Sequence, residues 1–314
     1  MLVNWLLVLL ALPAGALTAA RLLEGTLRRS HTPVPQLAAF APWALLPWAA
    51  TAVLAAATSR WLPALVAWAG FAVHAAWFVP ARAPQGPGGL PVRLASVNVL
   101  FGRADPAALV KLAADVDVLV VQELTPQLSA ALRGGLEEAG FTETDLHPAP
   151  YGMGTGVWSR WPLRPAGLLR SGRNRMPQVV VDAPGGSFEL TAVHTTAPQP
   201  GHLQAWRHDL DSVRAAVRTA SGPAVFAGDF NASRDHPHFR RILAAGTADA
   251  LDVVPGGPLG LAPAFTWPAD KPWPALTRLD HVLVTPQVRV DDARVTGVPG
   301  TDHRAVVVRL ALTT

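Results

Sequence analysis

The 314-residue chain contains no cysteine. That absence excludes disulfide bonds and cysteine-ligated zinc, although it leaves the cellular compartment open. Charged residues are also scarce, at 15%, whereas hydrophobic residues make up 50% of the chain and the mean hydropathy is +0.26. This balance is unusual for a purely soluble protein, so we expect part of the chain to lie in a lipid bilayer.

Net basic charge is absent from the larger part of the chain. The sequence pI near 10.5 invites a nucleic-acid interpretation. However, residues 1–90 hold five arginines and one acidic residue, whereas residues 91–314 hold 21 basic and 21 acidic residues. The larger part therefore lacks the basic footprint expected of a non-specific DNA-binding domain.

Long apolar runs are concentrated near the N-terminus. Residues 2–20 carry no charge and have roughly the length, about 20 residues, that crosses a bilayer core. No basic segment precedes them, so they make a poor cleavable signal peptide. Two further uncharged runs, 37–59 and 61–81, are separated only by Arg60 and predict a transmembrane hairpin. Tryptophans lie toward the ends of these two runs, where amphipathic rings favour the membrane interface.

A segment rich in proline and glycine marks a domain boundary. Residues 83–91, APQGPGGLP, are unsuited to continue a helix. We therefore predict an anchor of three transmembrane helices over residues 1–82, a linker over residues 83–91 and a second domain over residues 92–314.

The second domain alternates strand and helix patterns. Continuous apolar runs predict buried strands, and apolar residues at helical spacing over residues 202–218 predict an amphipathic helix packed on a sheet. Thr125, followed by Pro126, is expected to cap another helix. A helix is also expected over 106–114, and strands over 92–99, 116–121, 154–158, 179–182, 188–193, 279–284, 288–295 and 305–310.

The segment AVFAGDFNAS, residues 224–233, places an acid and an amide where a short apolar strand opens into a loop. In extended geometry Asp229 and Asn231 share one face, while Phe230 points to the other. A carboxylate and an amide on one face suit a hard divalent cation and a phosphate oxygen, since Mg²⁺ takes oxygen ligands. An Asx turn that closes the strand is the alternative, and on these residues alone it is favoured.

Other polar residues also follow or precede apolar strands. They are Asn98, Glu123, His194, Asp280, Asp302 and His303. Each alone has an ordinary explanation, such as a solvated strand-end acid, a cap or a buried core imidazole. Together they would place carboxylates, an amide and two imidazoles along one sheet edge, which side-chain packing does not explain.

Six segments, SVNV, VQE, AVHTTAP, GDFN, RLDHV and TDH, resemble in order the motifs of the endonuclease/exonuclease/phosphatase superfamily. This superfamily includes DNase I, abasic-site endonucleases, neutral sphingomyelinases and inositol-phosphate phosphatases. The resemblance covers about residues 91–310. It implies an α/β (α+β) fold, a four-layer sandwich of two packed mixed β-sheets flanked by helices, and a phosphoesterase that uses Mg²⁺, with Mn²⁺ as a substitute. Three apolar runs before such a domain also resemble the membrane-anchored VanJ-like proteins associated with glycopeptide resistance.

The resemblance assigns the metal site and the water-activating acid. Glu123 matches the principal metal ligand, and Asn98 and Asp302 match positions beside the metal. Asp229 matches the acid that orients or deprotonates the attacking water. Asn231 matches a donor to a phosphate oxygen on which charge develops.

The same resemblance assigns two histidines. His303 matches the imidazole at the reacting phosphate, and Asp280 matches the carboxylate that sets its tautomer. His194 matches a second histidine that protonates the leaving oxygen. The sequence identifies no carboxylate partner for His194.

Three further positions are interpreted with less support from the motifs. His281 stands where the family usually has an aromatic residue, and we interpret it as a platform of similar shape. Arg173 and Arg175, in SGRNRMPQ, are candidate substrate-binding clamps for phosphate. A solvated basic loop is the alternative for both arginines.

These observations predict a membrane-anchored phosphoesterase that hydrolyses a phosphate ester or pyrophosphate. A neutral domain behind a polytopic anchor favours a lipid-linked substrate, either an isoprenoid or a phospholipid, with the bilayer as partner. The alternatives are a membrane-tethered nuclease acting on nucleic acid, which is not favoured, and a catalytically inactive phosphate-binding module.

The charged residues and the VanJ-like resemblance favour opposite sides of the membrane for the second domain. Arg21, Arg28 and Arg29 follow the first apolar run, so the positive-inside rule places that loop, and after three spans the second domain, in the cytoplasm. The VanJ-like resemblance implies the opposite, with the site facing lipid-linked cell-wall intermediates. We follow the resemblance and predict a multi-pass protein of the cell membrane with an extracytoplasmic catalytic domain.

Overall fold

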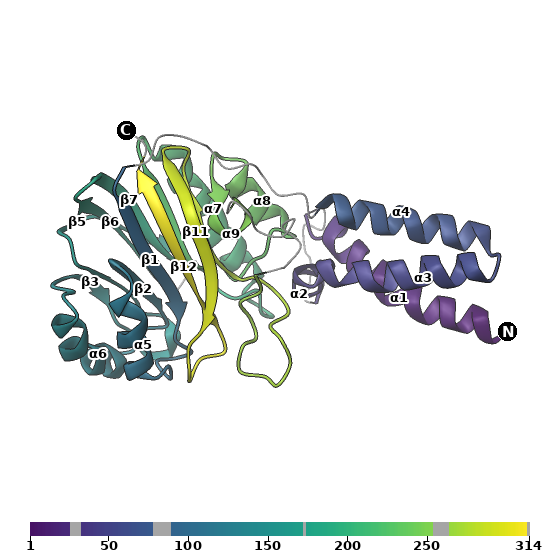
Figure 1. Cartoon of the computed structure of the whole chain (residues 1–314), viewed down its shortest axis with the longest axis horizontal. Coiled ribbons are helices and arrows are strands. Elements are labelled where there is room, and N and C mark those ends of the chain that lie inside the picture. Colours follow the sequence, from purple (N-terminus) through teal and green to yellow (C-terminus); the bar gives the residue numbers. More distant parts are fainter. Residues whose placement is uncertain (26–32, 78–88, 172–173, 254–263, 313–314) are drawn as a thin grey trace. The chain divides into compact units, whose positions relative to one another are not determined.

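The computed structural model of the chain describes residues 1–25, 33–77, 89–171, 174–253 and 264–312 (Figure 1). The chain divides into two compact units, one built mainly from residues 1–80 and the other mainly from residues 81–314. The linker predicted over residues 83–91 falls outside the described residues, apart from its last three.

The N-terminal unit is a set of apolar helices. They are α1 (Leu2–Leu23), α2 (Val34–Ala39), the 3-10 helix η1 (Ala41–Ala44), α3 (Leu45–Ala57) and α4 (Trp61–Trp77). Prolines divide the second apolar run, because Pro42 and Pro47 lie in the first turns of η1 and α3. A proline lacks the N–H that a helix interior uses, so it is tolerated in a first turn.

Of the described helices, α1 alone is long and apolar enough to cross a membrane, with 22 residues. Residues 41–57 and 61–77 form shorter apolar helices. The prediction of three transmembrane helices is therefore corrected to one candidate span. The second run is broken by its prolines, and the third is described as a helix only as far as Trp77.

The second unit contains two six-stranded sheets. Their orders are β11-β12-β1-β2-β4-β3 and β5-β6-β7-β8-β10-β9. The strands are β1 (Pro91–Asn98), β2 (Val118–Gln122), β3 (Glu143–His147), β4 (Thr155–Ser159), β5 (Leu163–Ser171), β6 (Asn174–Ala183), β7 (Gly186–His194), β8 (Ala224–Asp229), β9 (Ala248–Asp249), β10 (Asp280–Val284), β11 (Val288–Gly297) and β12 (Arg304–Leu312). The described helical segments are α5 (Pro106–Ala114), α6 (Pro126–Glu138), η2 (Pro150–Gly152), α7 (Leu203–Thr219), α8 (Pro237–Leu243) and α9 (Ala250–Val253).

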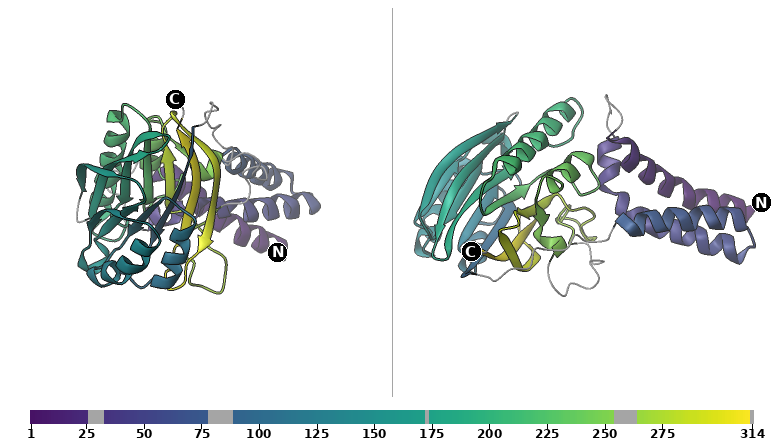
Figure 2. Two further views of the ribbon diagram at one scale, coloured as in Figure 1. Left: turned by 60° about the vertical axis from the view of Figure 1, so that its left-hand side comes forward. Right: turned by 90° about the horizontal axis from the view of Figure 1, so that it is seen from above.

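The two sheets pack face to face, and helices cover both outer faces, as Figure 1 and Figure 2 show. Leu94 and Val120 face the core between the sheets, while their neighbours Ala95 and Leu119 face α5 and α6. Helices α7 and α8 pack against the outer face of the other sheet, around Phe226. Strands buried on both faces read as continuous apolar runs. The predicted four-layer sandwich of two mixed sheets is confirmed.

Side-chain caps begin α5 and α6. Asp105 Oδ1 accepts a hydrogen bond from the N–H of Ala107 at 3.0 Å, and Thr125 Oγ1 accepts one from the N–H of Leu128 at 3.2 Å. Each cap is followed by a proline at the first helical position. The predicted cap at Thr125 is therefore confirmed, and it fixes where the loop after β2 ends and α6 begins.

Strand register brings the polar strand ends to one edge of the sandwich. β1 runs parallel to β2, with Asn98 opposite Gln122, and β7 runs parallel to β8, with His194 opposite Asp229. β10 is antiparallel to β8 and begins with Asp280 opposite Asp229. Parallel strands end, and their antiparallel neighbours begin, at the same edge. The site therefore forms at this edge.

Candidate active site

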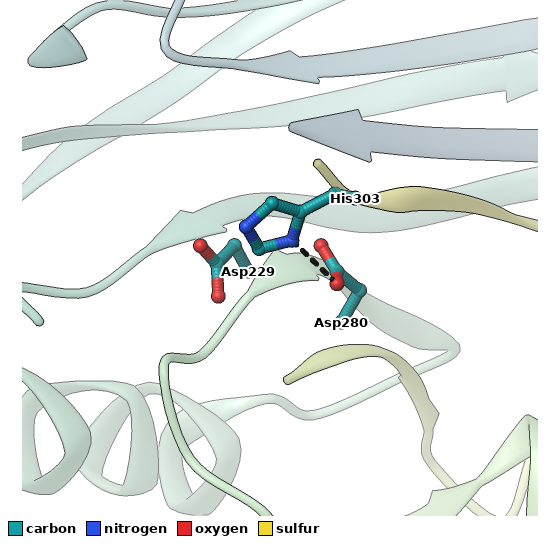
Figure 3. Close-up of side chains that lie close together, drawn as sticks. All are labelled: Asp229, Asp280 and His303. Carbon is teal, nitrogen blue, oxygen red and sulfur yellow. Dashed lines mark hydrogen bonds and ion pairs between the residues drawn. The ribbon is translucent and has the colours of Figure 1, made fainter. Parts of the chain in front are cut away.

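Three buried side chains meet where β8 ends and where β10 and β12 begin. His303 Nδ1 lies 2.8 Å from Asp280 Oδ2, and one ligand atom of each of Asp229, Asp280 and His303 lies within 4.8 Å of the others. Figure 3 shows the His303 ring between the two carboxylates. An imidazole held between two acids can orient water and exchange protons with it.

The charges in this cluster depend on one another. Burial alone would lower the pKa of His303, but Asp280, by its charge and its hydrogen bond, and Asp229 raise it to about 10. Burial raises the pKa of Asp229 to about 6, although the charge of His303 opposes that rise. Without a cation, His303 is therefore an imidazolium at neutral pH. An imidazolium cannot ligate a metal, so a cation bound at this cluster would have to displace the proton of His303.

Asn98 connects the acids of the two sheets. Its Nδ2 donates to Glu123 Oε1 at 3.1 Å and to Asp229 Oδ2 at 3.0 Å. The N–H of Phe101 donates to Glu123 Oε2 at 2.6 Å, and the N–H of Leu100 donates to Asn98 Oδ1 at 3.0 Å. Burial raises the pKa of Glu123, and Asn98 and Phe101 oppose that rise by binding the ionised form. Glu123 is thus a half-buried carboxylate fixed in direction.

Asp302 supplies a further oxygen beside this group. Its Oδ2 accepts from Trp267 Nε1 at 2.9 Å, while its Oδ1 is buried 3.9 Å from His303 Nε2. Neither Asp302 Oδ1 nor Asp280 Oδ1 has a hydrogen-bond partner among the described residues. The negative charge of Asp302 also acts on Glu123. Buried carboxylate oxygens without donors call for positive charge, and the carboxylates of Glu123 and Asp302 offer oxygen ligands, which suit a hard divalent cation.

Asn231 turns its amide toward the protein. Its backbone N–H donates to Asp229 Oδ1 at 2.8 Å, so the Asx turn expected as the alternative is present at the site itself. Its Nδ2 donates to the carbonyl oxygen of Thr195 at 3.0 Å and to Asp229 Oδ2 at 3.2 Å. A donation from Asn231 to phosphate therefore requires the side chain to exchange one of these contacts. In this arrangement Asn231 positions Asp229.

His194 ends β7 beside Asp229 but has a different environment from His303. Burial lowers the pKa of His194, against the charge of Asp229. Its Nδ1 is buried and has no hydrogen-bond partner among the described residues. Asp209, a nearby carboxylate, binds Thr196 instead, accepting from its N–H and its Oγ1 at 2.7 Å each. Burial thus favours the neutral form of His194, and its Nδ1 has no carboxylate partner among the described residues, which does not favour proton donation.

The structure describes only one of the two candidate phosphate clamps, Arg175. Arg173 lies outside the described residues. Arg175 is exposed near the start of β6, next to Asn174, whose Nδ2 donates to the carbonyl oxygen of His194 at 3.0 Å. This end of β6 therefore lies at the edge that carries the site.

His281 belongs to a buried network that the sequence did not predict. Its Nδ1 lies 2.6 Å from Asp249 Oδ2 and its Nε2 lies 2.9 Å from the carbonyl oxygen of Ala232. Arg278 Nη1 contacts Asp249 at 3.2 Å and Asp252 at 2.7 Å. His281 therefore links β9 and β10 to the loop after β8 by hydrogen bonds. The alternation of side chains along β10 could have indicated this. Because Asp280 faces the site, the next side chain, His281, must face away from it.

The comparisons with known proteins agree with this architecture. The Endonuclease/Exonuclease/phosphatase family matches residues 95–303, which is more than half of the chain, so the chain belongs to this family. A search of curated proteins gave no match. Family membership supports hydrolysis of phosphoesters, by a phosphoesterase or a nuclease, and the acidic residues at the site are of the kind that holds a divalent metal.

Solved structures share the fold. The endonuclease/exonuclease/phosphatase from Beutenbergia cavernae DSM 12333 is 22% identical, with a TM-score of 0.54, over 71% of this chain and 72% of that one. The protein of the same description from Bacteroides vulgatus is 19% identical, with a TM-score of 0.55, over 71% and 99%. Truncated Caenorhabditis elegans TDP2 is 18% identical, with a TM-score of 0.54, over 71% and 98%. At these identities the likeness shows the fold alone.

Proposed function

We propose that the protein is a membrane-anchored, Mg²⁺-dependent phosphoesterase of the VanJ-like branch that hydrolyses the phosphate ester or pyrophosphate of a lipid-linked substrate. The observation that carries the catalytic part is the Asp280–His303–Asp229 cluster, joined through Asn98 to Glu123. A catalytically inactive phosphate-binding module would not need a histidine oriented by one acid and facing another.

The proposed chemistry divides the site into two parts. Glu123, Asn98 and Asp302 would hold the cation, which when bound supplies positive charge to a phosphate oxygen. Asp229 orients the attacking water and accepts its proton. His303, held by Asp280, directs its Nε2 toward the reacting phosphate and stabilises the charge that develops there.

The membrane part of the proposal is supported by the surface of the N-terminal helices. Large apolar side chains are exposed on α1, α3 and α4. They include Leu2, Trp5, Leu9, Leu12, Leu46, Val53, Trp61, Leu62, Leu65 and Val66. So many exposed apolar side chains on one set of helices are unfavourable in water and favourable in lipid. We propose that α1 crosses the bilayer and that the α3–α4 hairpin also enters it.

The test uses the full chain, purified in detergent. With Mg²⁺ present, we expect hydrolysis of bis-p-nitrophenyl phosphate, and a chelator should abolish it until Mg²⁺ or Mn²⁺ is restored. A screen of phosphate release from prenyl pyrophosphates, phospholipids, sphingomyelin and DNA then identifies the substrate class. A preference for DNA would contradict the lipid assignment and favour the nuclease. No hydrolysis of any ester would contradict an enzymatic role.

The proposed side of the membrane is extracytoplasmic, and it rests on the VanJ-like resemblance. Alkaline phosphatase fused after Thr314 is expected to be active, and a green fluorescent reporter at the same position is expected to be dark. The reverse pattern would place the domain in the cytoplasm, as the arginines after α1 favour, and would direct the substrate search to nucleic acids and phosphoinositides.

A further inference from the structure

Two aromatic rings are exposed beside the site. Among the described residues of the catalytic unit, the exposed large hydrophobic side chains are those of Leu90, Phe101, Tyr151 and Trp273. Phe101, in the loop after β1, is 50% exposed, and Tyr151, in η2 before β4, is 84% exposed. Single exposed apolar residues are common, so exposure alone does not indicate a function.

The backbone at both positions is strained. The φ angle is +53° at Phe101 and +57° at Tyr151, in the left-handed region that bulky residues rarely adopt. Glu123 and Asn231 also have positive φ, so strained residues gather at this site. Strain persists where the surrounding structure imposes it, and it concentrates at functional sites. The fold therefore holds two apolar rings in solvent in a conformation that glycine or asparagine would adopt more easily.

Both rings lie on loops that adjoin Glu123. The N–H of Phe101 donates to Glu123 Oε2 at 2.6 Å. Gly152, next to Tyr151, packs against both Phe101 and Glu123. A β-carbon at Gly152 would lie 2.8 Å from Phe101 Cδ1 and 3.0 Å from Glu123 Oε2. Phe101 and Tyr151 therefore belong to the two segments that flank Glu123, and a substrate whose phosphate reaches the acidic site would carry its next atoms past these segments.

We propose that Phe101 and Tyr151 form an aromatic clamp that binds the hydrocarbon chain next to the substrate phosphate. The clamp rests on the proposed phosphoesterase function and specifies its substrate class, a phosphate ester or pyrophosphate of an apolar chain. The rings offer apolar faces and no charge, and the apolar helices of the N-terminal unit suit a protein that works where such chains occur.

A nucleobase is the rival occupant, because bases also stack on aromatic rings. Nucleic acid binding, however, needs a basic track for the backbone, and residues 91–314 carry equal numbers of basic and acidic residues. The charge balance therefore favours a hydrocarbon chain over a base.

The first measurement is the dependence of kcat/KM on chain length. The full chain, in detergent with Mg²⁺, is assayed with methyl, butyl and hexyl p-nitrophenyl phosphate and with thymidine 5′-p-nitrophenyl phosphate. Each methylene that the rings cover should raise kcat/KM about fourfold. With three or four methylenes covered, we expect the hexyl ester to exceed the methyl ester by about 100-fold, and to exceed the nucleoside ester.

The second measurement compares leucine with asparagine at each position, because the two side chains are similar in size. Leucine keeps an apolar contact, whereas asparagine removes it and tolerates the left-handed backbone better. The clamp predicts that Phe101→Asn and Tyr151→Asn lower the hexyl-to-methyl ratio at least tenfold, with an equal or higher Tm. Phe101→Leu and Tyr151→Leu should lower that ratio less than threefold. Leu90→Asn, at the opposite end of β1, is the control and should leave it unchanged.

Three results would overturn the clamp. They are a wild-type rate independent of chain length, asparagine variants that keep the wild-type ratio, and a nucleoside preference that the asparagine variants lose. The last would assign the rings to base stacking. If the wild type hydrolyses the methyl ester with no chain preference, the clamp fails and the phosphoesterase function stands. If it hydrolyses none of the esters, both fail.

Discussion

A single hydrogen bond determines which nitrogen of His303 is available for catalysis. Asp280 Oδ2 accepts from Nδ1 at 2.8 Å, so Nδ1 carries a proton. Nε2 is then the nitrogen that faces Asp302, at 3.9 Å from its Oδ1. The proposed roles of Asp280 and His303 are therefore inseparable, because the imidazole is oriented only while the carboxylate is in place.

The first prediction concerns Glu123, from the part of the site proposed to hold the cation, and His303, from the part proposed to act on the water and the phosphate. Glu123→Gln removes the charge expected to hold the cation, and His303→Ala removes the imidazole. We expect each to lower kcat/KM on bis-p-nitrophenyl phosphate at least about 100-fold, or about 3 kcal/mol, with little change in Tm. Steady-state kinetics at saturating Mg²⁺ and thermal unfolding test this.

The matched control for that experiment is Glu138→Gln, the same substitution on the exposed end of α6. It should leave both kcat/KM and Tm unchanged. Near-normal turnover in Glu123→Gln or His303→Ala would show that the assigned site is wrong. A large fall in Tm would show instead that the residue acts mainly on stability.

The second prediction concerns the pH dependence of stability at Asp249. Burial would raise its pKa, but the charges of His281 and Arg278 lower it to about 2. Because the folded pKa lies below the ordinary value of 3.8, this stabilisation is complete above about pH 4 and is lost as the pH falls through 2. The shift corresponds to about 2 kcal/mol. In denaturant unfolding, the stability difference between wild type and Asp249→Asn should shrink by that amount between pH 6 and pH 2. A constant difference would contradict the charged network.

At the scale of elements, α7 contacts both loops of the second sheet that carry site residues. Asp209 binds Thr196 in the loop after β7, and Trp206 Nε1 donates to the carbonyl oxygen of Asn231, after β8, at 3.1 Å. Trp206 and Asp209 are three residues apart, so they project from the same face of the helix. The helix thus holds the two loops in a fixed relation.

The third prediction tests this coupling through α7. Trp206→Phe keeps an aromatic ring in the core but leaves the carbonyl of Asn231 without its donor. We expect a loss of about 1 kcal/mol in the free energy of unfolding and about a tenfold fall in kcat. Trp158→Phe, a core substitution in β4 of the other sheet, is the control and should lower stability without changing kcat. If both variants lose stability and neither loses activity, α7 only contributes packing.

Strands with an apolar or alternating run could be predicted. They include the central strands β1, β2 and β8 and also the edge strand β11. β3 and β5 were missed because edge strands need no such run: β3 is polar, and β5 contains Pro165 and Gly167 at an irregularity in its pairing. The helix break in the second apolar run was missed because uniform hydrophobicity hides the effect of its prolines.

The site residues also divide into those that could be predicted from the sequence and those that could not. Residues at strand ends, such as Asn98 and Asp229, could be expected at one edge because parallel strands end together. The contact between His281 and Asp249 could not, because it depends on the register of a two-residue strand, β9, against β10. A sequence also cannot show that His194 Nδ1 is buried with no hydrogen-bond partner among the described residues, because burial depends on the fold.

At the scale of the whole molecule, charge and hydrophobicity are segregated. The apolar helices expose large side chains, whereas the catalytic unit buries its apolar residues in cores between and outside the two sheets. Each unit therefore has a surface suited to a different solvent. We infer that the N-terminal unit holds the protein at the membrane and that the catalytic unit carries out the chemistry.

The last prediction tests that division with a fragment that begins at Gly89, whose N–H donates to the carbonyl oxygen of Leu312 at 3.0 Å and so extends the first sheet. The fragment contains both sheets and every described residue of the site, so it should fold and hydrolyse bis-p-nitrophenyl phosphate at close to the full-chain rate. On a prenyl pyrophosphate in vesicles its rate should fall at least about 100-fold below that of the reconstituted full chain, because tethering supplies a high effective concentration. The full chain and the fragment in mixed micelles, where tethering gives little advantage, form the control. Equal rates on vesicles, or an insoluble fragment, would show that the helices do more than anchor.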